Sequence, residues 1–260
     1  AAGRTASGGY LVLASGWTPV QKPGDSSRVK IPEEGVLNAM VCRSADCGFT
    51  WTHDGSFALP DKSAPAPIPF GDVAEGDSGL LAAAAYNRWR PGENVAYFYV
   101  SEDDGISWRP RSEIGEKDCN ETALLHLHGG EWLAACRTLI DGHIRLYRSL
   151  DSGFVWTDEG SITLPRQHPA HLLRLVDGQI LLVYGMRNQG LYGIGARLSK
   201  DEGHTWGAPR LIVSLDDAND GGYPSSVQMP DGTIVTAYYA DQIIGHRRYH
   251  MGVVRWSITE

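Results

Sequence analysis

Three features are scarce in this 260-residue chain, and each absence argues against a class of protein. Its four cysteines (Cys42, Cys47, Cys119 and Cys136) form no CxxC pair, which argues against a small disulfide framework and predicts buried free thiols. No apolar run reaches the roughly 18 residues that a membrane span needs, so we expect no span. The net charge of −8 lacks the basic excess that a phosphate backbone requires, so we expect no nucleic-acid partner.

The N-terminal segment also lacks a feature, namely a hydrophobic signal core. Residues 1–9 read AAGRTASGG, which is compatible with the mature end of a cleaved, secreted or periplasmic protein. The sequence leaves the compartment and the oligomeric state open. It suggests a soluble protein and indicates no cofactor.

Glycine is abundant, and one turn motif containing it occurs four times. The chain has 31 glycines, and the pattern S-x-D-x-G-x-x-W occupies 44–51, 101–108, 149–156 and 199–206. We call these segments boxes 1 to 4. In each box the aspartate is expected to accept hydrogen bonds from turn amides, the glycine to take a positive φ and the tryptophan to pack between sheets. Four equivalent positions around a ring cannot converge on one substrate, so we expect the boxes to be structural.

A second repeat lies between the boxes. Five segments combine a turn glycine with a hydrophobic strand, at 8–16, 78–86, 129–137, 177–185 and 231–239. Another short strand precedes four of them, and a β-patterned run precedes each box. The repeating unit is therefore a four-stranded antiparallel blade of about 50 residues. We predict an all-β fold, a β-propeller with five visible blades that forms a single domain over residues 1–260.

Polar residues begin the predicted inner strands, where small apolar residues would be expected if the position were only structural. In a propeller these strand ends converge on one mouth, and the second strand of each blade returns to it. The inner strands begin near Asp72, Glu121, His168 and Tyr223, and the returning strands end near Arg137, Arg187, Tyr238 and Tyr239. Two arginines there predict an anion clamp, because guanidinium binds carboxylate bidentately. His168 and His171 are three apart on a strand and so face opposite ways, which disfavours a metal site.

The boxes, together with the order of the other motifs, resemble the Asp-box or BNR repeats of sialidases. NETALL with Glu121, then Arg137, Arg187 and GYPSSVQ with Tyr223 are similar to the C-terminal two-thirds of that family, over most of residues 68–260. The resemblance implies a retaining exo-glycosidase for a terminal anionic sugar, with Tyr223 as nucleophile and Glu121 as its base. A glycan or glycoconjugate would be its substrate. The candidate catalytic residues are Tyr223, Glu121 and Asp72, and the candidate substrate-binding residues are Arg137, Arg187, His168, Tyr184 and Tyr239.

The chain departs from the family pattern in two places. The family has six blades and a first arginine in an F-R-I-P motif, which this sequence lacks. The acid/base aspartate has no clear match in the loop 21–35, which offers Asp25, Glu33 and Glu34, so Asp72 is a rival by position. Two alternatives stay open: a catalytically inactive carbohydrate-binding propeller, and a hydrolase or lyase for another acidic sugar that uses Asp72 or His168.

Overall fold

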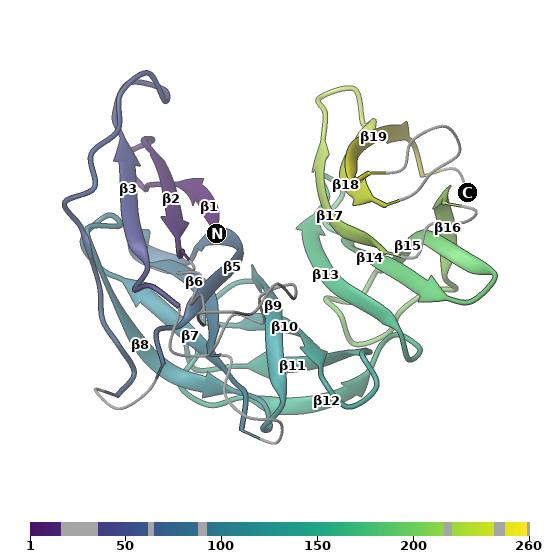
Figure 1. Ribbon diagram of the computed structural model, residues 1–260, viewed down its shortest axis with the longest axis horizontal. Coiled ribbons are helices and arrows are strands. Elements are labelled where there is room, and N and C mark those ends of the chain that lie inside the picture. The colour runs from purple at the N-terminus through teal and green to yellow at the C-terminus, as the bar shows by residue number, and fades with distance from the viewer. Residues whose placement is uncertain (17–35, 62–64, 88–92, 216–219, 242–247, 259–260) are drawn as a thin grey trace, which may run out of the picture. The chain divides into compact units, whose positions relative to one another are not determined.

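The computed structural model describes residues 1–16, 36–61, 65–87, 93–215, 220–241 and 248–258. Apart from one three-residue 3₁₀ turn, η2 (Asp77–Gly79), the regular structure of these residues is β-strand (Figure 1). No helix in this part of the chain is long and apolar enough to cross a bilayer. The prediction of an all-β fold is confirmed.

The strands form four sheets. Their orders are β3-β2-β1-β5-β6-β7-β8-β4, β12-β11-β10-β9, β13-β14-β15-β16 and β17-β18-β19. The chain also divides into two compact units, Ala1–Trp132 with Ser149–Trp156 (unit 1) and Leu133–Arg148 with Thr157–Glu260 (unit 2). Each unit is described by itself below.

Unit 1 contains the N-terminal hairpins and the strands around boxes 1 and 2. Its strands are β1 (Ala2–Arg4), β2 (Tyr10–Ala14), β3 (Met40–Ser44), β4 (Ser56–Phe57), β5 (Ile68–Glu75), β6 (Leu81–Asn87), β7 (Val95–Ser101), β8 (Ser107–Ile114) and β9 (Cys119–His126). Strands β5 to β8 pair antiparallel in chain order, as the predicted blade requires. Leu11, Val41, Tyr99 and Trp108 are at most 1% exposed and belong to one hydrophobic cluster.

Unit 2 contains the C-terminal blades. Its strands are β10 (Trp132–Thr138, whose first residue counts with unit 1), β11 (Ile144–Ser149, whose last residue counts with unit 1), β12 (Thr157–Ser161), β13 (Gln167–Arg174), β14 (Ile180–Asn188), β15 (Leu191–Ser199), β16 (Arg210–Ser214), β17 (Gly221–Gln228), β18 (Ile234–Ala240) and β19 (His250–Trp256). Strands β13 to β16 form an antiparallel ladder in chain order, and β17 to β19 do the same. Leu181, Val183, Ile194 and Ile234 are fully buried in its core.

The predicted tight turns open the expected hairpins. Gly130, Gly178 and Gly232 have φ of 82°, 87° and 84°, a region that glycine reaches without steric cost. In each case a strand ends within four residues before the glycine and another begins two residues after it. The turn glycines therefore set the strand order that the sequence predicts.

The outer strand of the first predicted blade is placed differently from the prediction. The segment after box 1 forms β4, which pairs in parallel with β8 instead of antiparallel with β3. The cause is aromatic packing: Phe57 is 4% exposed and stacks on Tyr99, with ring centroids 4.3 Å apart. Gly55 permits this route, since a Cβ there would lie 2.5 Å from the carbonyl oxygen of Ile106.

The boxes have the predicted turn geometry. In box 2, Asp103 Oδ1 accepts hydrogen bonds from Ser101 Oγ at 2.7 Å and from the Ser107 amide at 2.8 Å. Gly105 has φ 82°, and the Trp108 indole donates to its carbonyl oxygen at 3.2 Å. The box aspartates are therefore bound to their own turns.

The cysteine prediction is correct in part. None of the four cysteines forms a disulfide in the part of the chain that the structure describes, but only Cys119 and Cys136 are buried. Cys42 is half-buried, and Cys47 is exposed because it lies in the turn of box 1 with φ 60°.

Candidate functional site

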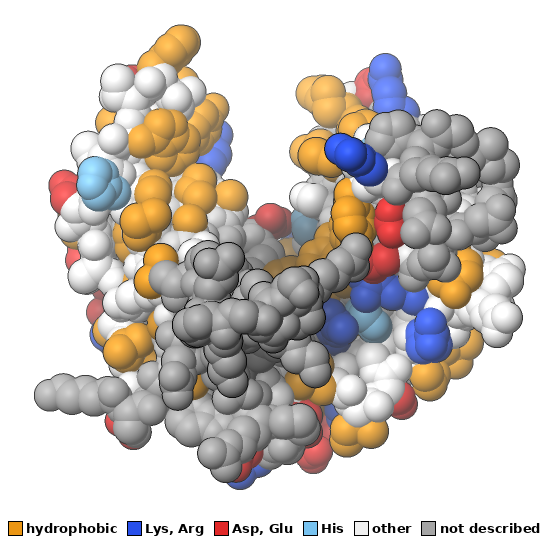
Figure 2. All heavy atoms as spheres, in the orientation of Figure 1, with side chains coloured by type: hydrophobic (Ala, Val, Ile, Leu, Met, Phe, Trp, Pro, Cys, Tyr) orange, Lys and Arg blue, Asp and Glu red, His pale blue; other side chains and the backbone are white. Residues whose placement is uncertain are grey.

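A basic cluster surrounds His168 at one end of the strands of unit 2. His168 is the second residue of β13 and is 6% exposed. Burial, together with the charges of Arg137, Arg187 and Arg166, lowers its pKa to about 3, so the imidazole is neutral at pH 7. Figure 2 shows Lys and Arg side chains gathered beside a histidine on the visible face of this part of the chain.

Two glycines allow the backbone to close around His168. A Cβ at Gly142 would lie 2.8 Å from the imidazole Nε2, so the loop after β10 passes directly over the ring. A Cβ at Gly185 on β14 would lie 2.8 Å from the carbonyl oxygen of His168 and 3.0 Å from Gly222 Cα. These close approaches hold the starts of β13 and β17 together.

Arg166 and Arg187 are joined through their backbones. The Arg187 amide donates to the Arg166 carbonyl oxygen at 2.9 Å, and Arg166 Nε donates to the Arg187 carbonyl oxygen at 2.8 Å. Arg166 precedes β13 with φ 65°. A third guanidinium is thus fixed near His168, in addition to the two that the sequence predicts.

Arg187 is also fixed by its side chain. Its Nε donates to the Gly221 carbonyl oxygen at 3.0 Å, and its Nη2 lies 3.1 Å from Asp220 Oδ1 and 3.2 Å from Tyr239 Oη. Tyr239 Oη in turn donates to Asp220 Oδ1 at 2.8 Å, and Tyr249 donates to Oδ2 at 3.3 Å. Burial and the Asp220 carboxylate raise the pKa of Tyr239, so it stays a phenol. The network holds Arg187 and the two tyrosines in one place.

Tyr223 lies beside this network on β17. Its ring centroid is 5.5 Å from that of Tyr239, and the Arg187 guanidinium carbon lies 5.8 Å from it. Tyr223 is 37% exposed and has φ 48°, an uncommon conformation for an aromatic residue. The strand irregularity between Gly222 and Ser225 turns this side chain out of the sheet. Tyr223 is therefore a partly exposed tyrosine of the cluster, as is Tyr249, which is 62% exposed.

The other predicted residues of unit 2 differ in exposure. Arg137, at the end of β10, is near enough to lower the pKa of His168 by its charge. Tyr184 on β14 is 1% exposed, and burial raises its pKa. A Cβ at Gly195 would lie 2.9 Å from the Tyr184 ring. This packing favours a structural role for Tyr184 over a role in substrate binding.

The two predicted carboxylates lie in unit 1. Glu121 is on β9 and is 6% exposed, whereas Asp72 is an exposed residue in the middle of β5. A Cβ at Gly71 would lie 3.5 Å from the carbonyl oxygen of Thr122, so these parts of β5 and β9 are neighbours within unit 1. The alternative acids Asp25, Glu33 and Glu34 lie outside the described residues.

Sequence reasoning missed Arg166, Asp220 and Tyr249. Each lies just outside a strand, whereas the prediction used strand ends counted from turn glycines. Arg166 had a detectable signal, since it stands two residues before the predicted mouth residue His168. Three guanidiniums around a neutral imidazole repel cations and attract anions, so we assign no metal to this cluster.

Solved structures share this fold. A protein of unknown function from Dyadobacter fermentans is 23% identical with a TM-score of 0.81, and the match covers 99% of this chain and 75% of that one. The Hadza microbial sialidase Hz136 is 20% identical with a TM-score of 0.68, over 95% of this chain and 50% of its own. Penicillium chrysogenum α-L-arabinanase, complexed with arabinobiose, is 17% identical with a TM-score of 0.66, over 96% of this chain and 79% of its own. The chain thus spans half the length of the sialidase.

These likenesses establish the fold, a sialidase-like β-propeller that contains four-stranded antiparallel sheets. No curated protein sequence matches the chain. A family model described as a BNR repeat-like domain matches residues 22–236, which include all four boxes. The chain therefore belongs to the BNR repeat-like domain family.

Proposed function

We propose that this protein is a retaining exo-glycosidase that removes a terminal acidic sugar of the sialic-acid type from a glycan. The observation that carries the proposal is the basic cluster around His168. Arg137, Arg166 and Arg187 all act electrostatically on this imidazole, which stays neutral at pH 7. The cluster therefore presents positive charge that a carboxylate can neutralise, with bidentate hydrogen bonds to guanidinium.

Tyr223 is the proposed nucleophile. It is 37% exposed and its ring centroid lies 5.8 Å from the Arg187 guanidinium carbon, whereas the hydroxyl of Tyr239 is hydrogen-bonded to Asp220 and Arg187. A neutral phenol approaches an anionic sugar without the repulsion that a carboxylate nucleophile would meet. In the proposed step the Tyr223 oxygen bonds to the anomeric carbon, its proton passes to a carboxylate base, and the glycosidic bond breaks. A proton from an acid is transferred to the departing oxygen, and water later hydrolyses the tyrosyl intermediate.

The resemblance to sialidases gives the base role to Glu121 and leaves Asp72 as the candidate acid. Both belong to unit 1, and their roles are proposals that variant kinetics can test. His168 is poorly suited to the acid role, because its pKa of about 3 leaves no imidazolium at neutral pH.

A second candidate function is binding of an acidic sugar without hydrolysis. One observation favours it: Arg187 already pairs with the carboxylate of Asp220 at 3.1 Å, which leaves fewer of its donors for a substrate. Under this reading the cluster of unit 2 is a lectin-like site and Tyr223 is a stacking surface.

The first experiment measures release of 4-methylumbelliferone from its sialoside by the wild type and by Tyr223→Phe. We expect the variant to lose at least about 1,000-fold in kcat because it removes the nucleophile. Substrate binding should survive, because the ring remains beside Arg187. Sialoside binding by a wild type that releases no fluorophore would support the binding reading. Cleavage of an arabinofuranoside but not of the sialoside would refute the acidic substrate.

The second experiment tests the basic cluster. Arg137→Ala combined with Arg187→Ala should reduce kcat/KM for the sialoside by about 100-fold or more, because two charge-assisted contacts are lost. Arg145→Ala is the matched control, since Arg145 pairs with Asp158 between β11 and β12. Equal activity of the double variant and the control would exclude a carboxylate clamp.

A further inference from the structure

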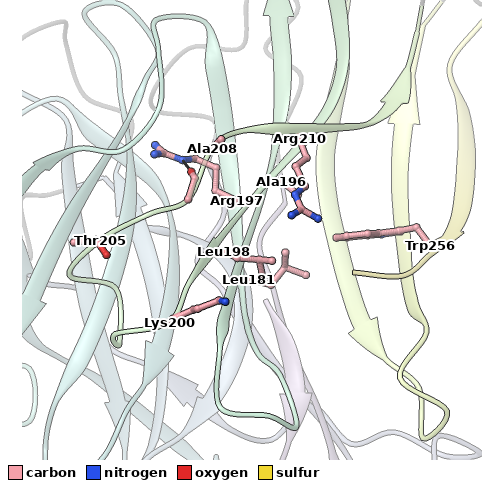
Figure 3. Close-up of a pocket in the computed structure, with 10 residues that line it drawn as sticks. Leu181, Ala196, Arg197, Leu198, Lys200, Thr205, Ala208, Arg210 and Trp256 are labelled. Carbon is pink, nitrogen blue, oxygen red and sulfur yellow. Dashed lines mark hydrogen bonds between the residues drawn. The ribbon is translucent and has the colours of Figure 1, made fainter. Parts of the chain in front are cut away.

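A pocket of about 320 Å³ lies in unit 2 beside box 4. It is lined by residues of β14, β15, β16 and β19 and of the box itself (Figure 3). Its volume is at the lower end of the range for small-molecule sites. The proposed hydrolytic function uses none of the ten lining residues.

The lining is basic and contains no carboxylate. Three of its ten residues, Arg197, Lys200 and Arg210, carry positive charge. Arg197 donates to the carbonyl oxygens of Gly207 at 2.8 Å, Ile162 at 2.5 Å and Trp206 at 2.9 Å, so each of its guanidinium nitrogens is held by the backbone and it contributes positive charge to the wall. In Figure 3 the Lys200 and Arg210 side chains point into the pocket from different sides. The pocket therefore attracts anions.

The carboxylate of box 4, Asp201, is hydrogen-bonded within its own turn. Asp201 is hydrogen-bonded to the lining residue Thr205, whose amide donates to Asp201 Oδ1 at 2.8 Å. Ser199 Oγ donates to the same oxygen at 2.8 Å. These hydrogen bonds hold the carboxylate in the turn and keep it out of the lining.

An apolar wall completes the pocket. Leu181 and Leu198 line it, and in Figure 3 the Trp256 indole extends from β19 toward them. The Trp256 ring is fixed by its Nε1, which donates to Thr236 Oγ1 at 3.0 Å. An indole held beside leucines suits a ring with an apolar face, and the cations suit one negative group on that ring.

The pocket is separate from the cluster around His168. Trp256 pairs with Ile234 at the start of β18, whereas Tyr239 is near the end of that strand. Five residues of extended strand span about 16 Å. A ligand of the pocket therefore does not occupy the position of a substrate beside Tyr239.

We propose that this pocket is a second binding site, which takes a sugar ring bearing a carboxylate. Lys200 and Arg210 bind the carboxylate, and the indole of Trp256 stacks on the ring. The choice of a sugar acid over another cyclic carboxylate rests on the proposed function, but binding here requires no turnover. Such a site would hold an acidic residue of a glycan while another residue occupies the cluster around His168.

The test is a titration followed at the indole N–H signal of Trp256 in ¹⁵N NMR spectra, assigned with Trp256→Phe. The probes are N-acetylneuraminate and glucuronate, with glucose and benzoate as comparisons. We expect at least one sugar acid to shift the signal at millimolar concentration, and glucose and benzoate to bind at least tenfold more weakly. Which acid binds more tightly distinguishes a sialic-acid site from a uronic-acid site.

Two variants locate the binding. Lys200→Gln with Arg210→Gln should weaken sugar-acid binding about tenfold or more, since charge-assisted hydrogen bonds are lost. Arg255→Gln is the matched control, because Arg255 is an exposed residue of β19 outside the lining. The proposal fails if neither acid shifts the signal, if glucose or benzoate binds as tightly, or if the double variant binds unchanged. An inactive wild type that passes these tests refutes only the hydrolytic function, and an active one that fails them refutes only this site.

Discussion

His168 is the residue whose chemistry the fold changes most. Its pKa falls to about 3 through burial and through Arg137, Arg187 and Arg166. In the unfolded chain a histidine titrates near pH 6.5. Between pH 6.5 and 3 the unfolded state therefore binds a proton that the native state does not, so acid destabilises the fold in this window.

The first prediction follows from this difference. From pH 7 to pH 4.5 the His168 proton alone should lower the free energy of unfolding by about 3 kcal/mol. His168→Gln, which cannot titrate, should remove most of that dependence in urea unfolding curves. A Gln variant with the same slope as the wild type would contradict the buried neutral imidazole.

The box aspartates do not contribute to the loss of stability that we expect from His168 between pH 6.5 and 4.5. Hydrogen bonds from Thr50 and Thr205 lower the pKa of Asp46 and Asp201 to about 2. A depressed carboxyl pKa costs stability only when the pH falls below the unfolded value near 4. A loss of stability between pH 6.5 and 4.5 is therefore not due to these carboxylates.

The sequence located part of the cluster at the residue scale. Turn glycines gave the strand ends, and these gave His168, Arg137, Arg187 and Tyr223. Asp220 was not predictable by that route, because it precedes β17 and binds Arg187 and Tyr239 through contacts that no strand periodicity encodes. Exposure was not predictable for Tyr184 either, because its burial depends on packing against Gly195 of the next strand.

At the scale of elements, the four boxes are equal in sequence but unequal in packing. Trp108 of box 2 is 1% exposed, whereas Trp51 of box 1 is 43% exposed. A hydrogen-bonded turn that anchors a buried indole contributes more to stability than one that anchors an exposed indole.

The second prediction compares two boxes. Asp103→Ala should lower the free energy of unfolding by about 2 kcal/mol, because it removes acceptors for Ser101 Oγ and the Ser107 amide next to buried Trp108. Asp46→Ala should cost less, and urea denaturation of both variants measures the difference. A larger loss of unfolding free energy for Asp46→Ala would contradict this prediction, because it would show that the turn with the exposed indole contributes more to stability.

The sequence pattern predicted most of the strands, but it did not predict the pairing of β4. Hydrophobic alternation and turn glycines predicted the hairpins, because local conformation and burial agree there. Strand β4 is two residues long and pairs with β8 because Phe57 packs on Tyr99. Because one aromatic contact between residues far apart in the sequence decides which strand β4 pairs with, no hydrophobic periodicity predicts this pairing.

At the scale of the whole molecule, we keep the proposal that residues 1–260 form one domain, although they cluster into two compact units. The third prediction tests it with two fully buried leucines, Leu81 of unit 1 and Leu181 of unit 2. Each change to alanine should cost about 2 to 5 kcal/mol and shift one calorimetric transition as a whole. Splitting of the transition by either change would mean that the units unfold independently.

The inequality of the boxes gives the molecule a set of built-in optical reporters. The indoles of Trp51 and Trp108 donate to carbonyl oxygens, that of Trp156 donates to Ser112 Oγ, and Trp206 Nε1 is buried without a hydrogen-bond partner in the described residues. Boxes 1 to 3 belong to unit 1 and box 4 to unit 2. Replacing the other tryptophans with phenylalanine would leave one emitter at a time, with fluorescence at longer wavelength for Trp51 than for Trp108. The repeated motif thus offers a way to follow the unfolding of each unit separately, by the fluorescence of one tryptophan in that unit.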